Sequence, residues 1–219
     1  TKINEYVNIT DNRIIQVGTG QVTGIYIQFD GNGDYHKNIN ISNNIIKTNH
    51  YCFSANINSA ELVDNHIGNL IFSNNIFETT AVDKSCVYVY SGILLDFLKI
   101  NGGKLTSGAY GIIIIGADNS GTLDVDSVFI DAASNPLHTY TSKLTNTFIR
   151  NCHLKGGGYL NLLASSNIIL QNNTLENMIK GGIKINTGVG VYTHGGNVKI
   201  NCSGVVENAA SSTNDGTDY

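Results

Sequence analysis

Four aspartates in predicted loops have the residue type and spacing for acid–base chemistry. They are Asp30, Asp34, Asp83 and Asp118. Asp30 and Asp34 lie beside Tyr35 and His36, which makes this the densest polar group of the chain. Hydrolysis of a glycosidic bond uses two carboxyl groups, about 5 Å apart for retention of configuration and roughly 6.5 to 9.5 Å apart for inversion. We therefore treat the four aspartates as candidate catalytic residues; the alternative for each is a solvated loop acid or a turn former.

Aromatic side chains form a second candidate set, because an exposed ring can stack on a sugar ring while neighbouring amides bond to its hydroxyl groups. Five residues at alternate positions of short apolar segments are expected to point outward as a ladder. They are Tyr26, Tyr88, Tyr90, His138 and Tyr140. His138 could also act as a base or bind an anion. The alternative is that these rings merely suit strands, or that they pack beneath loops or another subunit.

Seven short apolar segments would position these side chains, at intervals of about 23 to 35 residues. Each alternates with period two and is rich in β-branched or aromatic residues, which predicts strands. The segments are Gly24–Phe29, Tyr51–Ser54, Cys86–Tyr90, Gly111–Ile115, Pro136–Tyr140, Tyr159–Leu163 and Gly182–Asn186. The alternation predicts that Ile25 and Ile27 face the core and that Phe53 faces outward.

A second motif recurs between these segments, with two small polar residues flanked by apolar pairs. Lys37–Lys47 is the clearest copy. The others are Val7–Ile14, Leu70–Phe77, Leu98–Leu105, Leu123–Ile130, Thr147–Leu154, Ile168–Leu175 and Val198–Val205. A tight bend between strands needs a residue in the left-handed region, where Gly is free and Asn or Asp are the least penalised others. The motif places Asp11, Asn43, Asn74, Gly102, Ser127, Asn151 and Asn172 at this bend. Stacked asparagines are also expected to bond to one another along the pile.

The segment 59–68 departs from this repeat. Its residues Glu61–Ile67 mimic the corner only about ten residues before the next copy. We interpret the segment as an insertion rather than as a tight extra turn. Insertions on a solenoid often carry its specific site, so Glu61, Asp64 and His66 are further candidates.

Composition indicates β structure and argues against several classes of function. Of the 219 residues, 41 % are hydrophobic and 14 % are charged, whereas about 25 % charged residues is usual. The net charge of −4 gives no electrostatic case for binding nucleic acid or an anionic membrane. No apolar run reaches membrane-spanning length, and no signal peptide is evident. Because the repeat begins at once, without a capping unit, we expect a fragment of a longer protein.

The four cysteines, Cys52, Cys86, Cys152 and Cys202, form no CxxC pair and have no histidines at metal-ligand spacing. Cys152 and Cys202 fall at or beside the predicted Asn corner, where small residues fit. We expect buried free thiols, and neither a metal nor a cofactor.

Such units bury their apolar faces when they coil so that equivalent strands stack in parallel, about 4.8 Å apart. The prediction is an all-β fold, a right-handed single-stranded parallel β-helix (solenoid) of about 8–9 coils over residues 1–206. Residues 207–219 would be a polar tail or a truncated coil. On these motifs, residues 7–206 resemble the parallel β-helices of the pectate-lyase-like superfamily. Within it, the low charge and the Asn/Ile/Gly-rich coils look most like the β-helix domain of a bacteriophage tailspike or capsule depolymerase.

The resemblance implies a homotrimer of the virion tail that binds bacterial surface polysaccharide, either capsule or O-antigen. It also implies depolymerisation of that polysaccharide during host attachment, by a glycoside hydrolase rather than a lyase. Calcium-dependent pectate lyases hold their ion with carboxylates on the equivalent sheet, and the outward positions here contain no Asp or Glu, which argues against that mechanism. The alternatives are a non-catalytic receptor-binding spike, a structural shaft or adhesin, and a secreted bacterial protein.

Several outward positions are apolar where a monomer would expose polar groups. They are Ile71, Ile113, Ile115, Phe148, Leu163 and Ile169. A parallel homotrimer would cover them, and cover by loops is the alternative.

Overall fold

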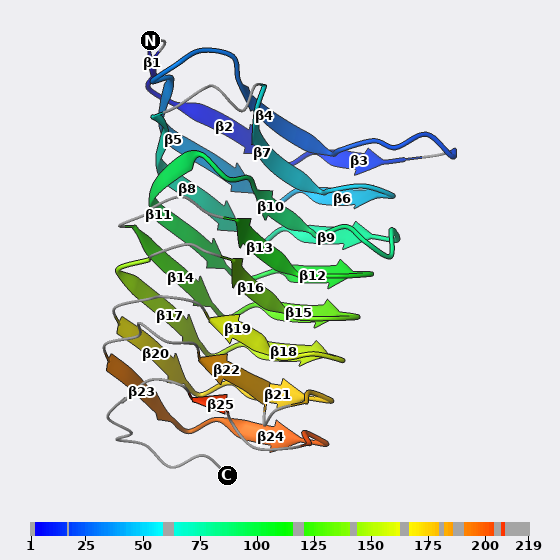
Figure 1. The fold of residues 1–219 in the computed structure, drawn as a ribbon. Coiled ribbons are helices and arrows are strands. Elements are labelled where there is room, and N and C mark those ends of the chain that lie inside the picture. The colour runs from blue at the N-terminus through cyan, green and yellow to red at the C-terminus, as the bar shows by residue number, and fades with distance from the viewer. Residues whose placement is uncertain are drawn as a thin grey trace.

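The computed structural model is a parallel β-solenoid in which three sheets run side by side along the molecule (Figure 1). It describes residues 3–16, 18–58, 64–115, 121–140, 144–162, 167–179, 182–185, 191–203 and 207–208. Successive coils pass through sheets A, B and C in turn, and neighbouring strands pair in parallel. The predicted all-β parallel β-helix is therefore confirmed.

Each coil contributes strands to all three sheets, so the order within each sheet follows the chain. Sheet A comprises β1 (Ile3–Asn4), β2 (Val7–Thr10), β5 (Tyr35–Ser42), β8 (Asn65–Ser73), β11 (Ile93–Asn101), β14 (Thr122–Asp126), β17 (Asn146–Arg150), β20 (Asn167–Gln171) and β23 (Val191–Gly195). Sheet B comprises β3 (Arg13–Ile15), β6 (Ile45–Thr48), β9 (Ile76–Thr79), β12 (Lys104–Ser107), β15 (Phe129–Ala132), β18 (His153–Gly156), β21 (Thr174–Glu176) and β24 (Val198–Ile200). Sheet C comprises β4 (Ile25–Phe29), β7 (Phe53–Ile57), β10 (Val87–Val89), β13 (Ile112–Ile115), β16 (Leu137–Tyr140), β19 (Leu160–Leu162), β22 (Ile183–Ile185) and β25 (Glu207–Asn208).

Sheets B and C each stack eight strands among the described residues, so the number of coils is close to the eight to nine expected. The short strand β25 pairs with β22 and is the last described element. Residues 209–219, in the predicted tail, lie outside the described residues.

Alternation within each strand sends one set of side chains into the solenoid. In sheet A, Ile41 of β5 pairs with Phe72 of β8, and Phe72 pairs with Ile100 of β11. All three side chains are buried. Burial of such a side chain stabilises a fold by about 1.5–3 kcal/mol. Stacked coils thus supply a continuous core that one coil could not form alone.

All seven predicted corner residues adopt the left-handed conformation, with φ between 54° and 65°. They join sheet A to sheet B; Asn43 lies between β5 and β6, and Asn74 lies between β8 and β9. The last coil continues the series with Gly196, at φ 66° between β23 and β24. The preference for Asn, Asp and Gly at this bend follows from the low strain of these residues at positive φ.

The second residue of five corners is an asparagine, and the side chains of these residues form a ladder of amides in two parts. The backbone N–H of Asn12 donates to Asn44 Oδ1 at 3.0 Å, and that of Asn44 donates to Asn75 Oδ1 at 2.9 Å. Asn75 Nδ2 donates in turn to the Ile41 carbonyl at 2.8 Å. The expected bonding between stacked asparagines is confirmed, with this inner residue as its carrier. Such bonds satisfy backbone groups that the bend removes from the sheets.

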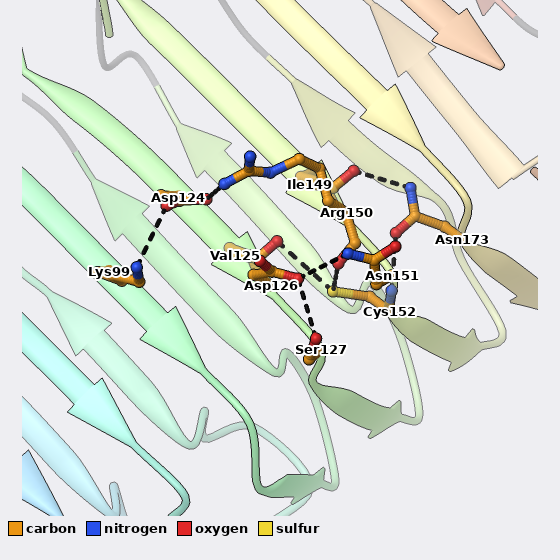
Figure 2. Close-up of polar contacts among 10 residues, drawn as sticks. All are labelled: Lys99, Asp124, Val125, Asp126, Ser127, Ile149, Arg150, Asn151, Cys152 and Asn173. Carbon is orange, nitrogen blue, oxygen red and sulfur yellow. Dashed lines mark hydrogen bonds and ion pairs between the residues drawn. The ribbon is translucent and has the colours of Figure 1, made fainter.

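The ladder is interrupted in the middle of the molecule and resumes at Asn173 and Asn197. The three intervening coils carry Gly103, Val128 and Cys152 at this position. Cys152 partly replaces the amide, because its Sγ lies 3.6 Å from the Val125 carbonyl oxygen (Figure 2). In the next coil, Asn173 Nδ2 makes the equivalent bond to the Ile149 carbonyl at 2.8 Å (Figure 2).

The prediction of an insertion at 59–68 is wrong for the C-terminal part of that segment, which begins β8. His66 pairs with Tyr35 of β5, and Ile67 is fully buried. The start of β8 pairs with the starts of both neighbouring strands, because Tyr35 of β5 pairs with His66 and Ile93 of β11 pairs with Asn65. The residue that imitated a corner is Asp64, which turns the chain into β8 at φ 58°.

The predicted outward orientation of Phe53 is also wrong. Phe53 pairs with Ile25 of β4 and with Val87 of β10, and all three are buried in the core. The two residues before Phe53 leave the phase of the alternation open. Tyr51 and Cys52 are both apolar enough to face either way. The two neighbouring strands decide the phase.

The prediction that Val198–Val205 is a copy of the corner motif is wrong, because the bend between sheets A and B comes before this segment. Val198–Ile200 form β24 in sheet B, and the bend from sheet A precedes them at Gly196. Asn201, at φ 52°, instead follows sheet B, as Asn177 does one coil earlier at φ 57°. Left-handed asparagines at both ends of sheet B make these two bends look alike in sequence.

Cys52, Cys86 and Cys152 are buried free thiols, as predicted, and Cys202 is a partly buried free thiol. Burial raises the pKa of Cys152 to about 11. Cys152 therefore behaves as a small core side chain rather than as a reactive group.

Candidate functional site

A groove lined by aromatic and small polar side chains lies on the outer face of sheet C, across β4, β7 and β10. Its volume is ≈ 460 Å³. The lining residues are Thr23, Tyr26, His50, Tyr51, Ser54, Asn56, Tyr88 and Tyr90. We name this site the aromatic groove. It brings together three of the five predicted binding residues, Tyr26, Tyr88 and Tyr90.

Strand register sets two of these tyrosines on either side of a small residue. Ser54 of β7 pairs with Tyr26 of β4 and with Tyr88 of β10. Ser54 is buried, so it forms a floor between the rings. Neighbouring strands are about 4.8 Å apart, which separates the two tyrosine positions by roughly 10 Å. The space above Ser54 between these two positions forms a slot, which Tyr26 and Tyr88 flank.

Tyr51 and His50 form a second layer of aromatic side chains at the groove, which the sequence did not predict. The rings of Tyr51 and Tyr88 are stacked, with centroids 4.5 Å apart and planes 21° apart. His50 meets Tyr51 edge-on at 4.5 Å, and its Nδ1 lies 2.7 Å from Thr23 Oγ1. Both residues come from the turn before β7. Tyr51 stands two positions before its strand, as Tyr110 does before β13, and this spacing is the signal that could have found it.

One ion pair flanks the groove. Lys84 Nζ lies 5.5 Å from the centroid of the Tyr51 ring and 2.8 Å from Asp83 Oδ2. The hydrogen bond from Lys84 is the main reason why the pKa of Asp83 is lowered. Asp83 is thus an ionised carboxylate at neutral pH, and its charge is balanced by Lys84.

The lining itself is uncharged at neutral pH. Burial raises the pKa of Tyr88 to about 12, with further contributions from Tyr51 and Tyr90. Burial also lowers the pKa of His50, and Lys84 adds to that effect, against a smaller opposite effect of Asp83. The groove therefore presents neutral rings, hydroxyl groups and an amide.

The predicted catalytic aspartates lie at separate places. Asp83 stands beside the groove but is not among its lining residues. Asp30 accepts a hydrogen bond from Gln28 Nε2 at 2.6 Å, next to the end of β4. Asp34 is buried and accepts from the backbone N–H of Gly31 at 3.0 Å, which is the geometry of a turn former. Asp118 lies outside the described residues.

His138 and Tyr140 belong to β16, and β13 lies between that strand and the groove. His138 Nε2 lies 3.0 Å from Asn161 Nδ2, and its ring meets the ring of Tyr110 edge-on at 5.3 Å. Burial lowers the pKa of His138. The aromatic groove therefore contains three members of the predicted ladder, and His138 is not among its lining residues.

Of the candidates in the segment 59–68, His66 lies in β8 of sheet A. His66 Nε2 is 2.7 Å from Asp96 Oδ1, and the ring of Tyr35 stacks on His66 with centroids 4.8 Å apart. Asp64 is exposed, and Glu61 lies outside the described residues. This histidine–carboxylate pair lies on the surface, and neither member lines the aromatic groove.

A charged network crosses the outer face of sheet A (Figure 2). Arg150 Nη2 donates to Asp124 Oδ1 at 2.7 Å, and Lys99 Nζ lies 3.8 Å from Asp124 Oδ2. Along the sheet, the order of the outer residues is Ile71, Lys99, Asp124, Phe148 and Ile169. The predicted apolar surface is therefore divided by an ion pair. On sheet C, Ile113 is nearly buried and Ile115 is half-buried.

Within the described ranges, no group of three or more His, Cys, Asp or Glu side chains could hold a metal ion. No helix in this part of the chain is long and apolar enough to cross a membrane. The chain matches no protein-family model, no curated protein and no solved structure.

Proposed function

We propose that this protein binds carbohydrate in the aromatic groove. Its β-helix would be of the pectate-lyase-like kind, in the form that a bacteriophage tailspike uses to attach to its host. The ligand would be a bacterial surface polysaccharide, capsule or O-antigen, and the protein would act on the virion tail.

The observation that carries this proposal is the slot between Tyr26 and Tyr88 above Ser54. A pyranose ring has flat C–H faces and a rim of hydroxyl groups. The tyrosine rings can stack against its faces, and such contacts contribute about 0.5–1.5 kcal/mol beyond area burial in aromatic pairs. Hydroxyl and amide groups at the edge of an apolar site fix the orientation of a ligand, and Thr23, Ser54 and Asn56 supply them here.

Binding to a panel of purified capsules and O-antigens tests the proposal. At least one polysaccharide is expected to bind, and Tyr88→Ala is expected to weaken that binding by about tenfold or more, since it removes both a stacking face and the support for Tyr51. Tyr6→Ala is the matched control, because Tyr6 is 64 % exposed and does not line the groove. Equal affinities of Tyr88→Ala and the wild type for the bound polysaccharide would contradict the proposal.

Cleavage of the bound polysaccharide is a second candidate function, favoured by Asp83. Its lowered pKa keeps it ionised beside the groove, as a general base or nucleophile requires. Hydrolysis would release reducing ends without unsaturated uronates, whereas a lyase would produce both signals. Asp83→Asn should abolish hydrolysis with binding retained; turnover that survives this substitution would rule out Asp83 as the catalytic group.

A parallel homotrimer belongs to the same proposal. The half-buried side chains of Ile71, Phe148 and Ile169 on sheet A would be covered by a second copy. Light scattering coupled to size exclusion is expected to give three times the mass of 23.5 kDa. A monomer at micromolar concentration would contradict this part of the proposal without affecting the groove.

A further inference from the structure

We infer that the aromatic groove selects an uncharged pyranose of the glycan chain and rejects the corresponding uronate. This inference rests on the proposed carbohydrate binding, and it names the class of sugar that the site takes.

The first support is the chemistry of the lining. Each of the eight lining residues is a tyrosine, threonine, serine, asparagine or histidine. His50 is the member that titrates nearest to neutral pH, and burial favours its neutral form. A sugar carboxylate in the groove would therefore lose water without gaining a charged partner from the lining, which is unfavourable.

The second support is the state of the flanking cation. Lys84 is already paired with Asp83 at 2.8 Å, and only 20 % of its side chain is exposed. A uronate would have to displace Asp83 from Lys84, and the Asp83 carboxylate would repel it. The ion pair therefore excludes an anionic sugar more than it attracts one.

The third support is the hydrogen-bonding capacity at the rim. Asn56 Oδ1 accepts a hydrogen bond from the backbone N–H of Ile57 at 2.8 Å, so the amide can offer a ligand its Nδ2 donor and the second lone pair of Oδ1. Thr23 and His50 share a contact of 2.7 Å and can exchange donor and acceptor roles. A sugar hydroxyl can both donate and accept, so it suits this mixed rim, whereas a carboxylate only accepts.

Matched oligosaccharides that differ only at C6 test the inference. The pairs are mannohexaose with hexamannuronate and galactohexaose with hexagalacturonate, alongside each capsule that binds and its carboxyl-reduced derivative. The chain has no Trp, so a change in tyrosine fluorescence reports on binding directly, and calorimetry gives the affinity. The neutral member of a bound pair is expected to bind about tenfold or more tightly than its acidic counterpart at low ionic strength.

Asp83→Asn sharpens this test, because it releases Lys84 from its partner. The substitution is expected to raise the affinity for the acidic member several-fold and to change that for the neutral member by less than about twofold. Asp131→Asn is the matched control, since Asp131 is also paired with a lysine, Lys155 at 3.5 Å, but lies on sheet B. Removal of the Asp131 charge should leave both affinities unchanged.

The outcomes separate the two proposals. Acidic members that bind as tightly as neutral ones, or more tightly, would overturn the selectivity and leave the carbohydrate-binding function standing. Unchanged affinity of Asp83→Asn for uronates would overturn the role of the ion pair in that selectivity. Failure of every pair and every capsule to bind would overturn the proposed function itself.

Discussion

The outer face of sheet C has two halves that share one strand register and differ in chemistry. On β4, β7 and β10 the register aligns Tyr26, Ser54 and Tyr88. On β13, β16 and β19 it aligns Ile113, His138 and Asn161. The first half is open, because Tyr26 is 47 % exposed, and the second half is closed, because Ile113 and Asn161 are 9 % and 8 % exposed.

The difference lies in the sizes and pairing of the side chains, not in the backbone. A large, small, large sequence leaves a slot above Ser54. In the second half, His138 and Asn161 lie 3.0 Å apart, and the edge contact with Tyr110 covers the histidine. A parallel solenoid thus fixes which side chains are neighbours, while the residues at those positions decide whether a binding site forms.

The substitution with the largest expected effect unfolds both halves of sheet C together. Ile41→Asp places a carboxylate at a fully buried position of the core column, where no cation can reach it. Burying an unpaired charge costs far more than a typical domain can tolerate. We expect circular dichroism to show loss of β structure and calorimetry to show no cooperative unfolding transition.

Ile41→Val is the control for this substitution. It removes one buried methylene and should cost about 0.5–1.5 kcal/mol, with the fold retained. An Ile41→Asp variant that melts at the wild-type temperature would mean that the side-chain register of β5 is wrong, and the aligned columns of sheet C would then lose their basis.

A smaller effect is confined to the closed half. His138→Ala removes the contact with Asn161 and leaves a small cavity beside Tyr110. Loss of a buried hydrogen-bonded group costs about 1–3 kcal/mol, which lowers the melting temperature of a chain of this size by several degrees at roughly 2–4 °C per kcal/mol. Affinity for a bound polysaccharide should stay within about twofold of the wild type, and a larger loss would place His138 in the binding site.

In the open half, a substitution is expected to lower the affinity for polysaccharide and to leave the stability nearly unchanged. Tyr26→Ala removes one wall of the slot, and we expect the affinity for polysaccharide to fall by about two- to twelvefold, which corresponds to the 0.5–1.5 kcal/mol of one aromatic contact. Because Tyr26 is exposed, the melting temperature should change by less than about 2 °C. Titration calorimetry and thermal melting on the same sample separate the two effects.

Much of the fold could be predicted because its bends depend on local conformation. Positive φ restricts the corner to a few residue types, so Asn43, Asn74 and even Ser127 could be placed from the motif alone. The predicted orientation of Phe53 and the predicted corner at Val198 are wrong because the two segments fit two registers equally well. In each case a neighbouring coil decides the register, and that information is not local.

The candidate site could be predicted only in part for a similar reason. Period two placed Tyr26 and Tyr88 outside, which the structure confirms. Tyr51 and His50 come from a turn, where alternation gives no direction, and their role depends on stacking with the next coil. Alternation also predicts an outer position for His138, but it gives no information on the contact of this side chain with Asn161.

The prediction with the smallest expected effect concerns stability at alkaline pH, which tests how well Tyr88 is enclosed. The phenol has a pKa of about 12 in the folded protein and about 10 when unfolded, so the folded state holds this proton more tightly. Its contribution to stability is complete below pH 10 and is lost as the pH rises from 10 to 12.

In Tyr88→Phe the free energy of unfolding should therefore fall less over this range than in the wild type. The difference should be smaller than the roughly 2.7 kcal/mol that two pKa units represent, because Tyr88 is only half-buried and solvent screens the effect. A slope of Tyr88→Phe equal to that of the wild type would mean that the ring of Tyr88 is open to water.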